Sequence, residues 1–121
     1  MKTIIAGSRT FEDYNAFLSL LKSDSTAQDM LRKTIEVVTG GARGIDTLGA
    51  LYARSINLKV RIFHAQWGSH GRAAGPIRNK EMANYADSLI AFWDGKSRGT
   101  KNMILEMFKR RKPFHIIRLD R

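Results

Sequence analysis

Five short apolar runs, separated by stretches with helical spacing, constrain the fold of this chain more than any other feature of its sequence. The runs are rich in β-branched residues and cover residues 3–6, 35–39, 58–63, 88–92 and 114–119. Each run is typical of a β-strand, and its nearly continuous apolar character indicates burial on both faces. Because strands that alternate with helices form parallel sheets, the sequence predicts a three-layer α/β domain with a mostly parallel sheet of about five strands.

The segments between the runs carry helical signals. Thr10 and Asp13 have the spacing of a capping box, so Thr10 is expected to open the first helix. Residues 22–34 are expected to contain the end of that helix and another short one. Further helices are expected to begin near Asp46, Gly75 and Thr100. The apolar faces of the four main helices are expected to include Phe17 and Leu21, then Leu48, Leu51 and Tyr52, then Met82 and Tyr85, and finally Met103, Ile104, Met107 and Phe108.

The length and the residue types exclude several classes of protein. The chain has 121 residues and no cysteine, so we expect residues 1–121 to form a single domain without disulfides or thiolate metal sites. His64, His70 and His115 lack the spacing of a zinc site, and neither a metal nor a cofactor is expected. No apolar run approaches the ~20 residues of a membrane span. The apolar stretch at the start of the chain is shorter than the apolar region of a signal peptide. These features predict a cytoplasmic protein.

The charge is unusual and unevenly distributed. The formal net charge is +10, from 21 Lys and Arg against 11 Asp and Glu. Residues 1–60 carry a net charge of +2, whereas residues 61–121 carry +8. A basic half of this kind indicates an anionic partner, which is a nucleic acid, the phosphates of a nucleotide or an acidic membrane surface.

The turns that follow the first four expected strands share a composition that suits phosphate. They cover residues 7–9, 39–46, 67–79 and 93–102, and each contains glycine together with arginine or lysine. Glycine lets backbone N–H groups approach phosphate oxygens, and arginine adds bidentate charge-assisted hydrogen bonds. In open parallel sheets, ligands bind beyond the carboxyl ends of the strands, where the strand order reverses. The turns therefore predict an anion-binding cleft at this edge of the sheet.

Seventeen residues of these turns are candidate ligand-binding residues. Arg43 and Arg78 are the foremost expected phosphate ligands. Asp46 is expected either to cap the following helix or to bind a ribose hydroxyl, and Asn79 to orient a loop. The candidates are Gly7, Ser8, Arg9, Gly40, Gly41, Arg43, Gly44, Asp46, Trp67, Arg78, Asn79, Asp94, Gly95, Ser97, Arg98, Gly99 and Thr100.

Two familiar nucleotide-binding motifs are absent. The tripeptide Gly95-Lys96-Ser97 has the ending of a P-loop, but Ile90 occupies the position of the first glycine. No G-x-G-x-x-G follows the first expected strand. Kinase-like phosphoryl transfer and ordinary dehydrogenase chemistry are therefore not expected.

The four turns together resemble a known family. Residues 6–9 (AGSR), 40–46 (GGARGID), 71–79 (GRAAGPIRN) and 92–100 (FWDGKSRGT) are similar to motifs of the YspA branch of the SLOG superfamily. These are small Rossmann-like, YpsA-related domains of bacteria and their phages, and the resemblance covers nearly the whole chain. It implies a single Rossmann-like domain that binds a nucleotide or a derivative such as NAD or ADP-ribose. The protein would then be a sensor, a sequestering protein or a weak processing enzyme.

Two relatives of that superfamily suggest other functions. LOG phosphoribohydrolases cleave the N-glycosidic bond of nucleoside monophosphates, and Gly99-Thr100 and Arg78 resemble parts of their pattern. The position of their glutamate falls on Met103, so Glu81, Asp46 or Asp94 would have to replace it.

The second relative, DNA-processing protein A, binds single-stranded DNA and has a similar A-R-G-I-D turn. Trp67 and Trp93 are expected either to pack or to stack on bases, as such binding would require.

The basic run 109–112 is interpreted as a solvated helix end in which Glu106 pairs with Arg110, away from the cleft. A small nucleotide-like ligand is therefore favoured over nucleic acid, no membrane partner is expected, and a homo-oligomer is left open.

Overall fold

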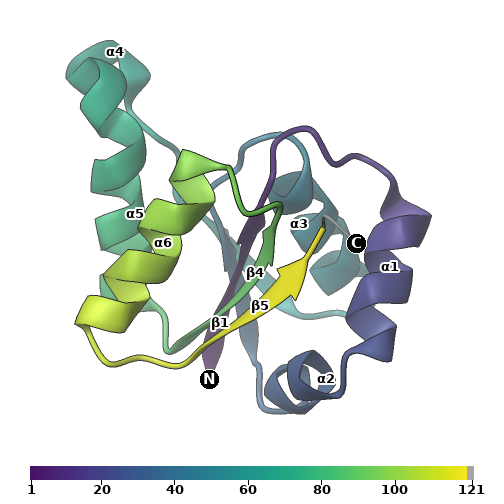
Figure 1. Cartoon of the computed structure of the whole chain (residues 1–121). Helices are drawn as coiled ribbons and strands as arrows, with labels where there is room; N and C mark the ends of the chain where they lie inside the picture. The colour runs from purple at the N-terminus through teal and green to yellow at the C-terminus, as the bar shows by residue number, and fades with distance from the viewer. Residues whose placement is uncertain (120–121) are drawn as a thin grey trace.

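The sheet contains five strands that all run parallel. The computed structural model describes residues 1–119, and its strands lie in the order β3-β2-β1-β4-β5 (Figure 1). Their bounds are β1 (Lys2–Gly7), β2 (Glu36–Thr39), β3 (Lys59–Ile62), β4 (Ser88–Trp93) and β5 (Phe114–Arg118). The five predicted strands are thus confirmed.

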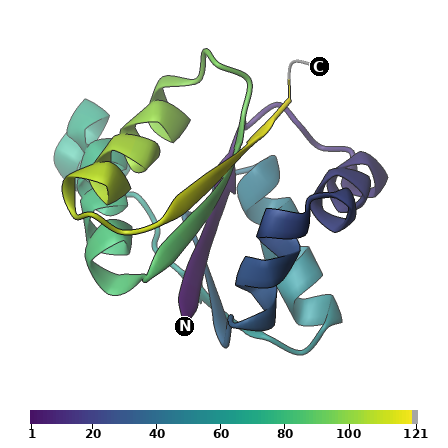
Figure 2. The same cartoon turned by 60° about the horizontal axis from the view of Figure 1, so that its bottom comes forward.

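Helices cover both faces of the sheet, as Figures 1 and 2 show from two directions. One layer consists of α1 (Tyr14–Ser23), α2 (Ser25–Arg32) and α3 (Ile45–Ser55). The other layer consists of α5 (Ala74–Tyr85) and α6 (Arg98–Lys109). The short helices α4 (Trp67–His70) and η1 (Gly71–Ala73) lead into α5. The protein is therefore the expected three-layer, Rossmann-like α/β domain.

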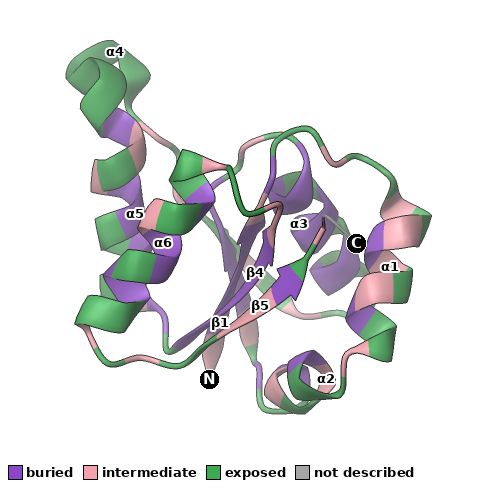
Figure 3. Cartoon of the chain, in the orientation of Figure 1, coloured by how far each residue is buried: buried purple, intermediate pink, exposed green. Residues whose placement is uncertain are grey.

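The two faces of the sheet bury separate apolar cores. Ile5 of β1 belongs to a core with residues of α1, α2 and α3, whereas its neighbours Ile4 and Ala6 belong to a core with residues of α5 and α6. This alternation follows from the two-residue period of a strand. Burial is continuous along the interior of β1 and β4 (Figure 3), because both faces of these central strands are covered.

Some expectations about burial are wrong. β3 is mostly exposed rather than buried on both faces, because it lies at the edge of the sheet. Leu51 of α3 and Phe108 of α6 are 47% and 66% exposed, although both were expected on apolar helix faces. They lie outside the arc of each helix that packs on the sheet.

The helices begin slightly differently from expectation. Asp13 and not Thr10 is the cap of α1, since its Oδ1 accepts the N–H of Ala16 at 3.0 Å. A capping side chain must lie directly before the first helical residue, which is Tyr14. The end of α1 and the short helix α2 fall within residues 22–34, as expected. The short helices α4 and η1 were not expected from the sequence.

The basic run at residues 109–112 stabilises the fold instead of being only a solvated helix end. Arg110 donates to Glu106 at 2.7 Å, as expected, and its Nε donates to Asn84 Oδ1 at 2.7 Å. Lys112 Nζ donates to the carbonyl oxygens of Ala83 and Ala86 at 2.8 Å. A cation at this place also interacts favourably with the negative, C-terminal end of the α5 dipole. Arg110 and Lys112 therefore support the packing of α5 and α6.

The strand order reverses beside β1, and this positions the functional surface. β1 leads to α1 on one face of the sheet, whereas its neighbour β4 leads to α6 on the other face. The two connections separate at the carboxyl ends of these strands and leave a crevice between them. No helix within residues 1–119 is long and apolar enough to cross a membrane.

Candidate functional site

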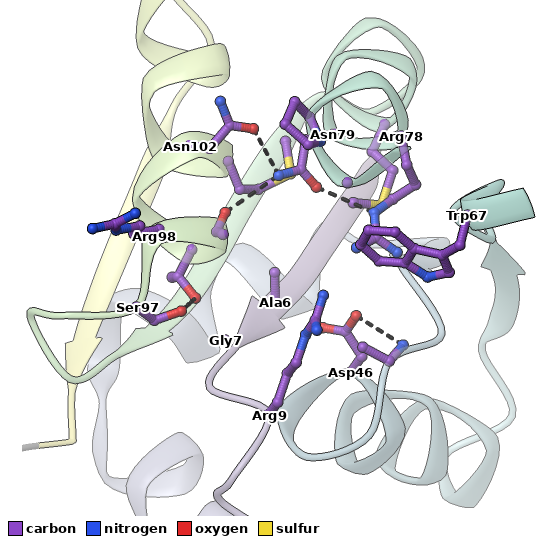
Figure 4. Close-up of a pocket in the computed structure, with 17 residues that line it drawn as sticks. Ala6, Gly7, Arg9, Asp46, Trp67, Arg78, Asn79, Ser97, Arg98 and Asn102 are labelled. Atoms are coloured by element: carbon purple, nitrogen blue, oxygen red, sulfur yellow. Dashed lines mark hydrogen bonds between the residues drawn. The ribbon is translucent and has the colours of Figure 1, made fainter. Parts of the chain in front are cut away.

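A cleft of about 430 Å³ lies at the carboxyl ends of β1 and β4 (Figure 4). Its position agrees with the predicted edge of the sheet. The cleft is lined by ten of the candidates from the sequence, namely Gly7, Arg9, Asp46, Trp67, Arg78, Asn79, Ser97, Arg98, Gly99 and Thr100. Segments far apart in the sequence therefore meet at one site.

A second chamber of about 340 Å³ adjoins this cleft. Arg9, Ala42, Trp67 and Arg78 line both spaces and form their common wall. The second chamber is also lined by three further candidates, Gly40, Gly41 and Arg43, and by His64 and Ala65.

Four candidates line neither space and instead shape the turns. The Ser8 carbonyl accepts the N–H of Ile45 at 3.1 Å. Gly44 has a φ of +79°, and a Cβ there would lie 2.3 Å from the same carbonyl oxygen. Asp94 Oδ1 accepts the N–H groups of Lys96 and Ser97 at 2.8 Å each, which lowers its pKa. Gly95, with a φ of +81°, completes that turn.

The N-terminus of α6 faces the cleft without a side-chain cap. Ser97 is the N-cap residue, but its side chain bonds no N–H of the helix and lies 3.1 Å from the Thr100 hydroxyl. The first N–H groups of an α-helix have no partner inside the helix, and the helix dipole makes this end positive. Ser97, Arg98, Gly99 and Thr100 all line the cleft. This end of α6 can therefore accept an anion.

Asn79 connects α5 to the start of α6. Its Nδ2 donates to the Gly99 carbonyl at 3.2 Å and to Asn102 Oδ1 at 2.8 Å (Figure 4). Asn79 Oδ1 accepts from Arg78 Nε at 3.3 Å. These bonds use both the donor and the acceptor of the amide, which suits the expected role in orienting a loop.

Arg78 is buried and holds two loops together. Its Nη1 donates to the carbonyl oxygens of Gly40 at 2.5 Å and Phe63 at 3.3 Å, which follow β2 and β3. A Cβ on Gly40 would lie 2.3 Å from Arg78 Nη1, so a larger residue there would displace the Arg78 guanidinium. Burial lowers the pKa of the Arg78 guanidinium, and nearby Asp46 opposes this shift. Arg78 therefore has a structural role that the sequence did not predict.

Asp46 is the buried carboxyl of the site. It is not the N-cap of α3, which is Gly44. Instead, its Oδ2 accepts the N–H of Ala42 at 3.2 Å and holds the preceding loop. Burial raises the pKa of Asp46 to about 6, although Ala42, Arg78 and Arg9 favour the charged form. A carboxyl of this kind in a cleft is a candidate for proton transfer or for binding a hydroxyl.

Three exposed arginines line the two spaces: Arg9 and Arg98 line the cleft, and Arg9 and Arg43 line the second chamber. Within residues 1–119, Arg9, Arg43 and Arg98 form no ion pair. The Arg9 guanidinium instead lies 5.7 Å from the centre of the Trp67 ring. Their charges are therefore available to an anionic ligand.

The two tryptophans differ in their availability. Trp67 is 51% exposed and lines both spaces, so one ring face can meet a ligand. Trp93 lines neither space, and its Nε1 donates to the Ser97 carbonyl at 3.1 Å. Trp93 therefore supports the turn before α6.

The cleft also contains residues that were not candidates. Met82 of α5 and Met103 of α6 line it together with Ala6 of β1. His64 lines the second chamber two residues after the end of β3, where the position of strand ends could have indicated it. The remaining additions are Ala42, Ala65, Gly75 and Pro76, and Asn102, the last residue of the fourth predicted turn, lines the cleft as well. No group of three or more His, Asp or Glu within residues 1–119 could hold a metal ion.

We expect Arg78→Ala to lower the free energy of unfolding by about 3 kcal/mol. The change removes the donor for two carbonyl oxygens and leaves the Asp46 carboxyl without its nearby buried cation. Urea denaturation measures the effect. Arg98→Ala, which removes an exposed arginine from the same cleft, should stay within about 0.5 kcal/mol of the wild type. Equal stabilities of the two variants would contradict this role for Arg78.

We expect Asp46 to make the protein less stable as the pH rises from about 4 to about 6. In this range the folded state keeps the Asp46 proton, because its pKa is about 6, whereas the unfolded chain has lost it. About two pKa units correspond to a loss of about 3 kcal/mol. Asp46→Asn should lack this component in urea unfolding at several pH values. The same pH dependence in both proteins would show that Asp46 titrates normally.

Comparisons with known proteins provide one informative relative. No family model and no solved structure matches the chain. The Gene 61 protein of Mycobacterium phage D29 is 33% identical to it over 116 residues, which cover 89% of each protein. An identity of this size over almost the full length of both chains shows a common family. The chain therefore belongs to the same family as the Gene 61 protein of Mycobacterium phage D29.

Proposed function

We propose that the chain binds a nucleotide or a nucleotide-derived ligand in the cleft between α5, α6 and the end of β1. We also propose that the family it shares with the Gene 61 protein is a branch of the SLOG superfamily of the YspA type. The motifs at residues 6–9, 40–46, 71–79 and 92–100 support this assignment. A parallel sheet whose strand order reverses at the cleft is compatible with it.

The observation that carries this proposal is the meeting of an uncapped helix N-terminus with unpaired arginines. The first turn of α6 lines the cleft together with Arg9 and Arg98, and neither arginine has a carboxylate partner in the described chain. Phosphate suits this arrangement, because free N–H groups and guanidinium groups both donate hydrogen bonds to its oxygens.

The rest of the cleft suits the nucleoside part of such a ligand. Met82, Met103 and Ala6 provide apolar surface beside the polar groups, and Trp67 offers an aromatic face. Ligand sites combine apolar walls with a few polar groups in this way, and about 430 Å³ lies within their usual range. A protein that binds such a ligand would act as a sensor, a sequestering protein or a weak processing enzyme.

Single-stranded nucleic acid is the less favoured partner. Its binding usually requires several exposed aromatic rings along a basic groove. Here Trp93 is engaged in the turn before α6, and Arg110 and Lys112 of the basic run bond to α5 and α6. A compact ligand is favoured over a long strand, because the available arginines lie together around the two spaces.

We expect the protein to bind at least one nucleoside 5′-monophosphate, and we expect Arg9→Ala to weaken this binding about tenfold or more. Loss of a hydrogen bond to a charged group accounts for an effect of this size. Isothermal titration calorimetry with the adenine, guanine, cytosine and uracil monophosphates measures it. Arg54→Ala removes an exposed arginine from the last turn of α3 and should bind normally. No binding of any monophosphate would contradict the proposal.

Cleavage of the N-glycosidic bond is a second candidate function, and the position of Asp46 favours it. Among the described residues that line the two spaces, Asp46 is the one with a carboxylate. The pKa of Asp46 is raised to about 6. Glu81 and Asp94 line neither space, and Met103 lines the cleft without a proton-transferring group. Hydrolysis would therefore depend on Asp46 as the acid or base.

If the protein cleaves nucleoside monophosphates, we expect Asp46→Asn to abolish the release of free base. With Asp46 as a general base, the rate of the wild-type enzyme should rise with pH through about 6. Chromatography of incubations with the four monophosphates measures the release. Arg54→Ala is the matched active control. No release at high protein concentration, or undiminished release by Asp46→Asn, would exclude this mechanism.

A further inference from the structure

We infer that the second chamber binds a second phosphate group of the same ligand. The preferred ligand would then be a nucleotide with at least two phosphate groups rather than a monophosphate. This inference rests on the proposed function, because it requires a nucleotide in the adjoining cleft. The family resemblance allows ligands with two phosphate groups, such as NAD or ADP-ribose, as well as nucleoside monophosphates, and the second chamber favours the former.

The second chamber is lined by several arginines. Its described lining contains Arg9, Arg43, Arg78 and His64 but no acidic residue. The adjoining cleft, in contrast, contains the carboxyl of Asp46. Asp46 of the adjoining cleft offsets part of the charge of Arg9 and Arg78, but none of the chamber's arginines forms an ion pair in the described chain, so an anion between them would lower their mutual repulsion. The second chamber is therefore the more exclusively cationic of the two.

The partners of the loop backbone show which groups would contact the anion. Gly41 N–H donates to Thr39 Oγ1 at 3.1 Å, and Ala42 N–H donates to Asp46 Oδ2 at 3.2 Å. These two donors are already used, so they are not free to form a backbone phosphate cradle. The contacts would come from side chains, above all from the exposed and unpaired Arg43.

Close contacts hold the loop that carries Arg43 against the end of β3. Gly41 has a φ of +70°, and a Cβ there would lie 2.7 Å from Ile62 Cγ2 and 3.1 Å from the His64 ring. The glycine loop therefore packs closely against the end of β3. Arg78 Nη1 bonds both the loop at Gly40 and the carbonyl of Phe63, which fixes the opposite walls relative to each other.

The common wall allows one ligand to reach both spaces. Arg9 and Trp67, which Figure 4 shows at the cleft, also line the second chamber, and both side chains are exposed. A base or sugar held near Trp67 in the cleft could therefore extend a phosphate past Arg9 toward Arg43. The spaces of about 430 Å³ and 340 Å³ are each large enough for part of such a ligand.

The test compares ligands that differ only in phosphate number. Calorimetry would measure the affinities of the 5′-monophosphate, the 5′-diphosphate and the 3′,5′-bisphosphate of the best-bound nucleoside to wild type, Arg43→Ala and Arg54→Ala. We expect at least one two-phosphate ligand to bind wild type about tenfold more tightly than the monophosphate. Arg43→Ala should remove this gain and leave monophosphate affinity unchanged, whereas Arg54→Ala should retain it.

The possible failures are distinguishable. Equal affinities of all three ligands for wild type would overturn the second phosphate site while leaving the proposed nucleotide site intact. The same conclusion follows if Arg43→Ala still binds the two-phosphate ligand more tightly than the monophosphate. It also follows if Arg43→Ala weakens the binding of both ligands by the same factor. Absence of binding by all three ligands would overturn the proposed function itself. Thermal unfolding checks that Arg43→Ala is folded, which is expected because this side chain is exposed.

Discussion

The position of β1 between β2 and β4 is the constraint on which the functional surface depends. The chain leaves β1 and β2 for helices on one face of the sheet, and it leaves β3 and β4 for helices on the other. The crevice at the carboxyl ends of β1 and β4 follows from this reversal, because no connection crosses it. The four glycine-rich turns then border one site although they are far apart in the sequence. The fold therefore creates the site before any ligand contributes.

Buried polar contacts give this crevice a defined shape. Arg78 joins the loops after β2 and β3, Asp46 holds the loop before α3, and Asn79 joins α5 to the start of α6. Each group is buried, so each needs partners to offset its loss of hydration. These contacts hold the loops that carry the exposed arginines and leave the charges of those arginines unused.

The basic charge of the chain is therefore divided among different tasks. Arg110 and Lys112 stabilise the packing of α5 and α6 at the amino side of the sheet. Arg78 is used mainly inside the protein, whereas Arg9, Arg43 and Arg98 are exposed around the two spaces. The net charge of +10 favours an anionic partner, and the proposed ligand would use only the few arginines that line the two spaces.

The sequence by itself determined the strands, the main helices and the turns of the site, because apolar periodicity, glycine and proline act over a few residues. It could not separate residues that contact a ligand from those that shape a turn: Ser8, Gly44, Asp94 and Gly95 share the composition of their neighbours. It also could not show that β3 is an edge strand or that His64 joins the site. Only the tertiary structure decided that Arg78 bonds Gly40, 38 residues earlier, and that two chambers share one wall. Such contacts depend on burial and on partners from distant segments, which no local pattern encodes.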